Sequence, residues 1–299
     1  MGDIFSLVAE QAEGCVAERE FSFAAHTTMG IGGNAPLCLR PKSVGAAVNA
    51  VRVLQKYGVP YIALGAGANV LASDKGFCGA VISTDKLSAV TAEEDIVYAE
   101  SGVRMARLLR VLAESGLGGF AFMAGIPASV GGAVYMNAGT ARGHFGDGVL
   151  SVTAIDEKGV LREFSKEECA FEYKHTAFTG KGQLILSARL AAKYCCRARA
   201  LEDIREVLAE RERLPKGKSM GCVFKNPEGI SAGALIERAG MKGAREGGAF
   251  ISERHANFII NGGNATAGDV RALIERVKSA VLKSSGILLT EEIEYIGDD

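Results

Sequence analysis

An uncharged run of 27 residues, at positions 115–141, constrains the fold of this chain more than any other feature. A run of this length could cross a membrane as a helix. This one contains seven glycines and Pro127, and both residue types weaken helices. We therefore predict that it forms buried backbone around a ligand, and we expect no membrane partner.

Glycine is frequent in the whole chain, at 38 of 299 residues, whereas about 7% is usual. Because no G-X-Y repeat is present, the excess predicts tight turns and close approaches of backbone to a ligand. The 34 Lys and Arg residues nearly balance the 35 Asp and Glu residues, for a net charge of −1. That balance provides no general attraction to nucleic acid, and we expect no nucleic-acid partner.

The cysteines indicate free thiols. Their number, seven, is odd, Cys195 and Cys196 are adjacent, and no C-x-x-C motif occurs. This pattern fits neither a disulfide framework nor a tetrahedral zinc site. The N-terminus also lacks the basic start and apolar core of a signal peptide. We predict a cytoplasmic protein with no bound metal.

Helical and strand-like patterns follow one another along the chain and predict an α+β protein. The predicted helices are residues 44–57, 103–114, 201–211, 231–239 and 267–284. The predicted strands are residues 61–64, 80–83, 96–100, 149–155, 161–164, 184–191, 222–224, a segment near Phe250, residues 258–260 and the tail 287–296. Charged residues dominate positions 195–218, which are the best candidate for a linker.

Two familiar phosphate-binding motifs are incomplete. Residues 217–219 resemble the end of a P-loop, but Glu212 occupies the position of the earlier glycine. Residues 30–35 match the looser dinucleotide fingerprint, yet no strand precedes them and Pro36 follows. A Rossmann fingerprint opens a helix after a strand, and this segment does neither, so the Rossmann geometry is excluded.

Two other glycine-rich loops are stronger candidates for a cofactor cradle. Residues 65–70 follow a predicted strand, and their small side chains allow successive backbone N–H groups to converge on an anion. A structural turn is the other interpretation of this loop. The second loop is residues 124–133. Its Gly131 and Gly132 allow backbone to lie against a flat ring, and Ile126 and Pro127 can contact that ring.

Two such cradles, without a P-loop lysine or a Rossmann helix, favour an extended dinucleotide held by backbone, and FAD fits best. The predicted cofactor-binding residues are Gly65, Ala66, Gly67, Ala68, Asn69, Val70, Gly125, Ile126, Pro127, Ala128, Ser129, Gly131, Gly132, Asn137, Ala138 and Gly139.

The string AGIPASVGGAVYMNAG at residues 124–139 closely resembles the FAD-binding signature of UDP-N-acetylenolpyruvoylglucosamine reductases, the flavoenzymes that complete UDP-N-acetylmuramate synthesis for peptidoglycan. Further blocks match in the family's order, at residues 27–33, 64–71, 221–227, 239–261 and 286–297. The resemblance therefore spans essentially the whole chain. With no obvious insertion between residues 174 and 222, the chain resembles the shorter, second type of this reductase.

The resemblance implies an FAD-binding fold of the vanillyl-alcohol-oxidase (PCMH) type, made of two subdomains, and a separate α+β substrate-binding domain. The implied boundaries are 1–84, 85–197 and 198–285, with residues 286–299 returning near the first subdomain. It also implies that NADPH passes hydride to FAD, and that FAD passes it to C3 of UDP-N-acetylglucosamine enolpyruvate. No obligate protein partner is evident.

The resemblance also suggests catalytic residues. Cys222 stands where many relatives carry serine, and a thiol is intrinsically more acidic than a hydroxyl, so we predict that it donates the proton. Glu292 matches the family's glutamate before a branched residue, and strand alternation would turn it away from Glu291. Lys174 stands where relatives usually carry arginine and would stabilise the enolate. The structural alternatives are a buried cysteine and a surface glutamate.

The residues implied for substrate binding are Tyr173, Arg213, Lys225 and Asn226. Arg213 could equally be a solvated linker charge, and His255 is expected to make a structural hydrogen bond. Two other functions stay open. One is an FAD-linked oxidase on the same scaffold. The other is a catalytically inactive flavin- or nucleotide-sugar-binding protein, which Cys222, Lys174 and Ala68 (usually serine) would suit.

Overall fold

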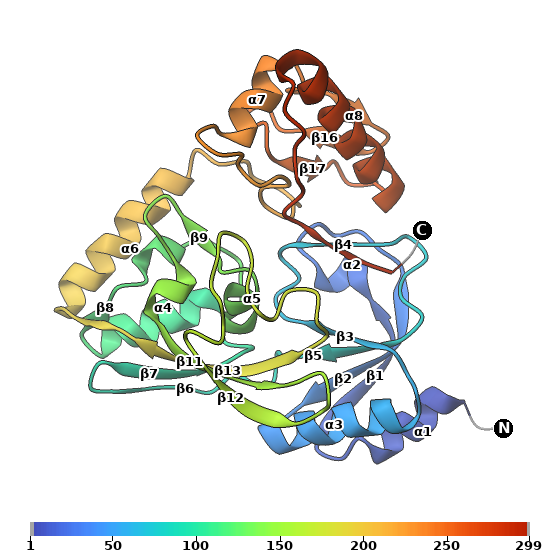
Figure 1. Ribbon diagram of the computed structural model, residues 1–299, viewed down its shortest axis with the longest axis vertical. Coiled ribbons are helices and arrows are strands. Elements are labelled where there is room, and N and C mark those ends of the chain that lie inside the picture. The colour runs from blue at the N-terminus through green and yellow to red at the C-terminus, as the bar shows by residue number, and fades with distance from the viewer. Residues whose placement is uncertain (1–2, 298–299) are drawn as a thin grey trace. The chain divides into compact units, whose positions relative to one another are not determined.

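The computed structural model describes residues 3–297 and divides them into two compact units (Figure 1). Unit 1 consists of the described residues up to Glu20, together with Pro36–Ala66 and Gly79–Arg211. Unit 2 consists of Phe21–Ala35, Gly67–Cys78 and the described residues from Glu212 onward. Since the chain passes repeatedly between the units, neither is one continuous segment. The implied division into domains at 1–84, 85–197 and 198–285 stays a prediction.

A four-stranded sheet with the order β1-β2-β5-β3 forms one part of unit 1. Helices α1 and α3 lie along it (Figure 1), and Val51 and Leu54 of α3 share a buried core with Leu37 and Ile82 of the sheet. Ser43 caps α3 by accepting a hydrogen bond from the Ala46 N–H. The bounds are α1 Ile4–Gln11, β1 Cys15–Ser22, β2 Asn34–Pro41, α3 Val44–Lys56, β3 Tyr61–Leu64 and β5 Ala80–Ser83.

The other part of unit 1 is a five-stranded antiparallel sheet with the order β12-β11-β13-β7-β6. Helix α4 buries Leu108 and Leu112 against this part of the core, and its arginines are exposed. The bounds are β6 Val90–Glu93, β7 Ile96–Glu100, α4 Met105–Glu114, α5 Val130–Tyr135, β11 Val149–Ile155, β12 Leu161–Ser165, β13 Leu184–Ala191 and α6 Arg197–Arg211. Short elements complete the unit: β8 Leu117–Gly118, η1 Ala121–Met123, β9 Gly139–Thr140, β10 Gly143–His144, η2 Phe145–Gly148 and β14 Lys193–Tyr194.

Residues 195–218 contain the predicted helix, as α6, but most of this stretch is not a linker. Helix α6 occupies Arg197–Arg211 and belongs to unit 1, where Val207 joins the same buried core as Leu112. A highly charged helix needs only a few apolar residues to pack, and its composition therefore resembles that of a linker.

Unit 2 contains a small antiparallel sheet with the order β15-β16-β17, together with helices α7 and α8. Leu235 of α7 and Leu273 of α8 share a core with Ile251. Thr266 and Asp269 form a capping box at the start of α8, and Gly286, in the left-handed conformation, ends it. The bounds are α2 Phe23–His26, β4 Val70–Ala72, α7 Ala232–Arg238, β15 Arg245–Glu246, β16 Ala249–Ile251, β17 Ile259–Asn261, α8 Ala267–Ser285 and β18 Glu294–Ile296.

Two predicted strands of unit 2 are wrong in form. Residues 222–224 make only single bridges, one from Cys222 to Phe258 and one from Phe224 to Glu291. In the tail, only Glu294–Ile296 is a strand, and it pairs in parallel with β4. Glu292 therefore lies outside the strand, so the alternation of side chains along a strand does not determine which way its side chain faces.

The uncharged run at 115–141 forms short elements and loops, of which α5 is the longest helix, with six residues. In the described part of the chain, we find no helix with the length and apolar character that spanning a bilayer requires.

Candidate functional site

Within unit 1, the start of helix α5, in the second predicted cofactor loop, contacts the beginning of the first loop. Ser129 caps the helix, with its Oγ accepting a hydrogen bond from the Gly132 N–H at 3.3 Å. A Cβ added to Gly65 would lie 2.4 Å from that Oγ. The loop after β3 thus contacts the helix start as closely as it does only because residue 65 is glycine.

Gly131 is glycine for a different reason. Its N–H donates to the Ser101 carbonyl at 2.8 Å, and an added Cβ would lie 2.8 Å from the Ser101 Cβ. Gly131 therefore allows α5 to pack closely on the segment after β7. At Gly132, in contrast, an added Cβ would meet only the Ser129 Oγ, at an ordinary 3.5 Å.

The first loop continues into unit 2 from Gly67 onward. Gly67 has a φ of +63°, and an added Cβ would lie 2.3 Å from the His26 carbonyl oxygen. The Asn69 side chain donates from Nδ2 to the Glu292 carbonyl at 3.1 Å, and the Glu294 N–H donates to the Asn69 carbonyl at 2.9 Å. Asn69 therefore connects this predicted cofactor loop to the segment that carries Glu292.

Asn137 ends α5 and holds a neighbouring turn. Its φ is +40°, and the N–H groups of Asn137 and Ala138 donate to Val134 and Ala133 in the pattern of a Schellman motif. The Asn137 Nδ2 donates to the Glu172 carbonyl at 2.8 Å, and its Oδ1 accepts from the Gly146 N–H at 2.9 Å. The side chain of this predicted cofactor residue thus positions the chain at Glu172.

Tyr173 and Lys174 occupy the tip of that turn. The Glu172 N–H donates to the His175 carbonyl at 3.0 Å, and Lys174 has a φ of +54°, a left-handed conformation that a lysine rarely adopts. The Tyr173 side chain is exposed and lies edge-on to His144, with ring centroids 6.4 Å apart. Unit 1 therefore presents a cation and an aromatic ring on a strained turn attached to the end of α5.

Within unit 2, the structure places the Cys222 segment beside the Glu292 segment. The Glu292 N–H donates to the Val223 carbonyl at 2.7 Å, and the Lys225 N–H donates to the Thr290 carbonyl at 2.9 Å. Cys222 itself is half-buried and is not part of a disulfide. The two residues predicted as acids from distant parts of the sequence therefore lie on directly bonded stretches of backbone.

Glu291, the neighbour of the predicted acid Glu292, is held by its own set of hydrogen bonds. Lys278 Nζ donates to its Oε1 at 3.0 Å, and the Tyr295 hydroxyl donates to its Oε2. Hydrogen bonds to Glu275 and Glu291 raise the pKa of Lys278, while burial, followed by the Glu291 carboxylate, raises the pKa of Tyr295. These contacts give Glu291 a structural role between α8 and β18.

The other residues predicted to bind substrate differ in their contacts and exposure. Asn226 accepts a hydrogen bond at Oδ1 from the Ala232 N–H, at 2.9 Å, and supports the start of α7. Lys225 is half-buried, whereas Arg213 is exposed shortly after the end of α6.

Burial lowers the pKa of His255, whose Nδ1 accepts from the Asn257 N–H at 3.3 Å. Sequence analysis did not single out Asn257, which is buried and bonded to the Cys222 segment.

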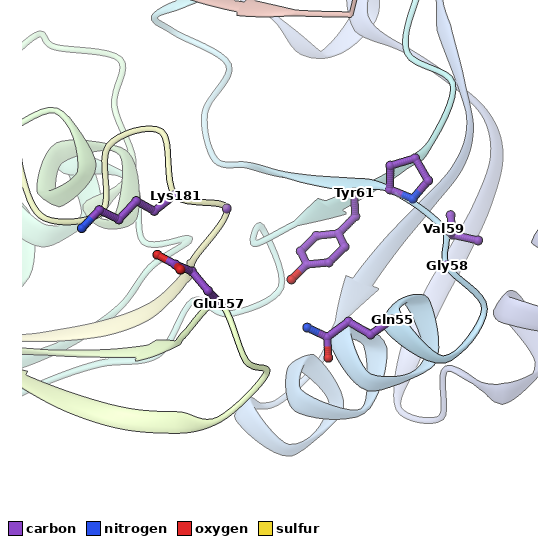
Figure 2. Close-up of a pocket in the computed structure, with 8 residues that line it drawn as sticks. Gln55, Gly58, Val59, Tyr61, Glu157 and Lys181 are labelled. Atoms are coloured by element: carbon purple, nitrogen blue, oxygen red, sulfur yellow. The ribbon is translucent and has the colours of Figure 1, made fainter.

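A separate pocket of about 420 Å³ lies in unit 1, and Figure 2 shows Tyr61 and Gln55 facing Glu157 and Lys181 across it. Its lining residues are Gln55, Gly58, Val59, Pro60, Tyr61, Glu157, Lys181 and Gly182. They include none of the predicted site residues, so this pocket is distinct from the cradle at α5.

Comparison with known proteins identifies the family. Residues 35–165 match the family model of an FAD binding domain, and residues 212–296 match that of the C-terminal domain of UDP-N-acetylenolpyruvoylglucosamine reductase. The chain is 42% identical to the UDP-N-acetylenolpyruvoylglucosamine reductase of Moorella thermoacetica over 280 residues, which cover 91% of each protein. This chain belongs to the UDP-N-acetylenolpyruvoylglucosamine reductase family.

Other relatives agree with this assignment. The reductase of Chlamydia muridarum is 40% identical over 274 residues, covering 90% of this chain and 91% of the relative. The crystal structure of the Thermus caldophilus reductase superposes with a TM-score of 0.81 at 34% identity, covering 94% of this chain and 99% of that one. A Physcomitrella patens BBE-like protein, with a TM-score of 0.51 and 15% identity, shares the fold alone.

Family membership confirms the predicted FAD-binding fold with its additional domain, and the predicted class of FAD-dependent reductase. Residues 212–296 match the reductase's own C-terminal domain, whereas an FAD-linked oxidase on the same scaffold would carry a different substrate domain.

Proposed function

We propose that this protein uses NADPH and FAD to reduce UDP-N-acetylglucosamine enolpyruvate to UDP-N-acetylmuramate, a step in peptidoglycan precursor synthesis. The observation that carries the proposal is the direct bonding of the Cys222 segment to the Glu292 segment, within the region that matches the reductase's C-terminal domain. The cytoplasmic location and the absence of an obligate protein partner stay predictions.

The cradle in unit 1 fits FAD. Two loops of small residues meet at Gly65 and Ser129, where an added methyl group would have no room. An extended dinucleotide held by backbone N–H groups needs such a surface. We propose that the cofactor-binding residues are those predicted above, from Gly65 to Val70 and from Gly125 to Gly139. Bound FAD supplies the hydride chemistry between NADPH and the enolpyruvyl double bond.

Cys222 holds the proton for the second half of the reaction. When hydride adds to C3 of the enolpyruvyl group, negative charge develops at C2 and the adjoining carboxylate. A proton on the Cys222 Sγ transfers to C2, and the sulfur keeps the electron pair of the broken S–H bond. Glu292, on the bonded neighbouring segment, is the second active-site acid.

Lys174 stabilises the negative charge of the enolate and carboxylate. An ammonium group is a compact charge, whereas a guanidinium can form two parallel hydrogen bonds with a carboxylate. Lysine therefore preserves the charge at this position but not the paired geometry. We propose that the UDP-sugar contacts Tyr173, Arg213, Lys225 and Asn226.

The test of the proposed function is a set of assays on the purified holoprotein. We expect a flavin absorption spectrum, NADPH oxidation that depends on the enolpyruvyl sugar, and a product heavier by two hydrogens. Oxygen uptake with an alcohol substrate would instead indicate an oxidase. Binding of flavin or nucleotide sugar without turnover would indicate an inactive binding protein.

Gly65→Ala is expected to weaken FAD binding by about tenfold or more. The new Cβ would force Ser129 to rotate and lose its cap on Gly132, which costs about 1 kcal/mol in addition to the distortion of the cradle. The measurement is the ratio of flavin to protein after purification, with the dissociation constant from flavin fluorescence. Gly45→Ala is the matched control, because an added Cβ at Gly45 meets only the Ser43 Oγ, at 3.9 Å. Equal FAD content in the two variants would contradict the assignment of the cradle.

Lys174→Ala is expected to slow reduction of the enolpyruvyl sugar by about 100-fold, as the loss of one preorganised charge at a developing anion does. Lys174→Arg retains the charge and is expected to remain within about threefold of the parent. The measurement is the steady-state rate at saturating sugar for both variants. A rate for the alanine variant equal to that of the parent would remove Lys174 from the mechanism.

A further inference from the structure

We infer that Asn257 is a positioning residue, which holds the segment carrying Cys222 in register with Glu292. The inference rests on the proposed function, because it assigns Asn257 a part in the step that Cys222 and Glu292 perform. Asn257 lies outside the residues predicted to touch cofactor or substrate, and it acts through the backbone of Phe224.

The contacts of Asn257 form a clamp on the residues that follow Cys222. Its Oδ1 accepts from the Phe224 N–H at 2.9 Å, and its Nδ2 donates to the Phe224 carbonyl at 2.8 Å. Its own carbonyl accepts from the Val223 N–H at 2.9 Å. Asn257 is only 3% exposed, so water does not compete for these bonds.

The clamp takes the place of a neighbouring strand. Residues 255–258 turn, with the Phe258 N–H donating to the His255 carbonyl at 3.1 Å, and β17 begins only at Ile259. The backbone there cannot continue a ladder along Phe224. A primary amide carries a donor and an acceptor side by side, so the Asn257 side chain supplies both bonds that a strand would make to one residue.

The other edge of the same segment bonds to the tail. The Val223 carbonyl accepts from the Glu292 N–H, while the Lys225 N–H donates to the Thr290 carbonyl. Phe224 therefore bonds on one side to Asn257, and its two neighbours bond on the other side to residues 290–292. With this pattern, the position of Cys222 relative to Glu292 depends on Phe224 remaining where Asn257 holds it.

Asn257 is itself held in place. Its N–H donates to the His255 Nδ1 at 3.3 Å, and burial lowers the pKa of that imidazole, which favours the neutral ring that can accept this bond. The chain of contacts runs from His255 through Asn257 and Phe224 to the stretch of backbone between Cys222 and Glu292. Each of these residues lies in unit 2.

The test is Asn257→Asp in the holoenzyme. This change retains size and one acceptor oxygen for the Phe224 N–H, but directs a second oxygen at the Phe224 carbonyl. We expect the rate at which saturating enolpyruvyl sugar reoxidises the reduced flavin to fall about 100-fold, the scale of a 1 Å misplacement of a reacting group. The dissociation constant of the sugar and the rate of flavin reduction by NADPH should stay within about twofold.

Two further measurements separate positioning from general stability. Thr266→Ala removes the cap of α8 elsewhere in unit 2, so it should lower Tm without slowing flavin reoxidation. Alkylation of Cys222 by iodoacetamide, followed by mass spectrometry, should become faster in Asn257→Asp, whereas the exposed thiol of Cys78 should react as in the parent. Asn257→Ser, which replaces the amide with a single, shorter hydroxyl, is the second variant if the aspartate variant does not fold, and it should show the same pattern.

A double-mutant cycle distinguishes the outcomes. If Asn257 acts through Cys222, adding Asn257→Asp to Cys222→Ala should not slow flavin reoxidation further. If Cys222→Ala slows this step and the folded Asn257 variants do not, the inference is overturned and the proposed function stands. An equal loss from Asn257→Asp with and without Cys222 also overturns the inference. If Cys222→Ala leaves the rate unchanged, the proposed proton donor is wrong.

Discussion

Cys222→Ala is expected to slow reduction of the enolpyruvyl sugar by about 1000-fold, within the range that a positioned general acid contributes. Cys222→Ser is expected to retain most of the rate, because a hydroxyl at the same position also carries a proton and the backbone bonds of Val223 and Phe224 are unchanged. Neither change alters the Gly65–Ser129 cradle of unit 1, so reduction of the flavin by NADPH should be as fast as in the parent.

Stopped-flow absorbance measures the two half-reactions separately, since the flavin loses its colour in the first and regains it in the second. Flavin reduction by NADPH is the internal control in every variant. Reoxidation by the sugar at the parent's rate in Cys222→Ala would show that the thiol is not the donor. A loss in both half-reactions would point to a change in the cofactor site instead.

Glu292→Gln is expected to have the second large effect, a loss of about 1000-fold in the same half-reaction. Glutamine has nearly the same size but cannot hold or transfer a proton. The backbone bond from the Glu292 N–H to the Val223 carbonyl survives the change, so the loss would come from the carboxyl group itself. Rapid mixing of reduced variant with the enolpyruvyl sugar measures it.

Glu291→Gln is the matched control. Its carboxylate bonds to Lys278 of α8 and Tyr295 of β18, and the side chains of Glu291 and Lys278 are 20% and 24% exposed. Losing such a partly exposed ion pair costs about 1 kcal/mol or less, so Tm should fall slightly while the rate stays within about threefold of the parent. The opposite ranking, with Glu291 essential and Glu292 dispensable, would reverse the assignment of the two glutamates.

Elements with strong local signals were predictable from the sequence. Strands β3, β5, β7 and β13 have the predicted bounds, because each is a short apolar run next to glycine, proline or polar residues. Helix α8 was predicted to within one residue, since its apolar spacing runs between a capping box and Gly286. In these segments, local pattern and tertiary packing favour the same structure.

Elements that depend on distant partners were not predictable in form. The segment at 222–224 and the tail before Glu294 look like strands, but residues 222–225 pair only at single positions, with residues 257–258 and with residues 290–292 of the tail. Helix α6 was predicted at residues 201–211, but its place in unit 1 was not, because its packing depends on few residues, such as Ala200 and Val207. The turn at Lys174 gave no signal, because the residue that holds it, Asn137, is 37 positions earlier in the chain.

The class of chemistry could be predicted from local strings of residues. The glycine loops indicated a dinucleotide, and the motifs around Cys222 and Glu292 indicated an enolpyruvyl reductase, because such motifs are local strings of residue types. The contacts that hold those residues became visible in the folded chain. Gly65 contacts Ser129, and Asn257 clamps Phe224 beside Cys222. A hydrogen bond between residues 33 positions apart depends on where packing places both of them, and no local pattern records that.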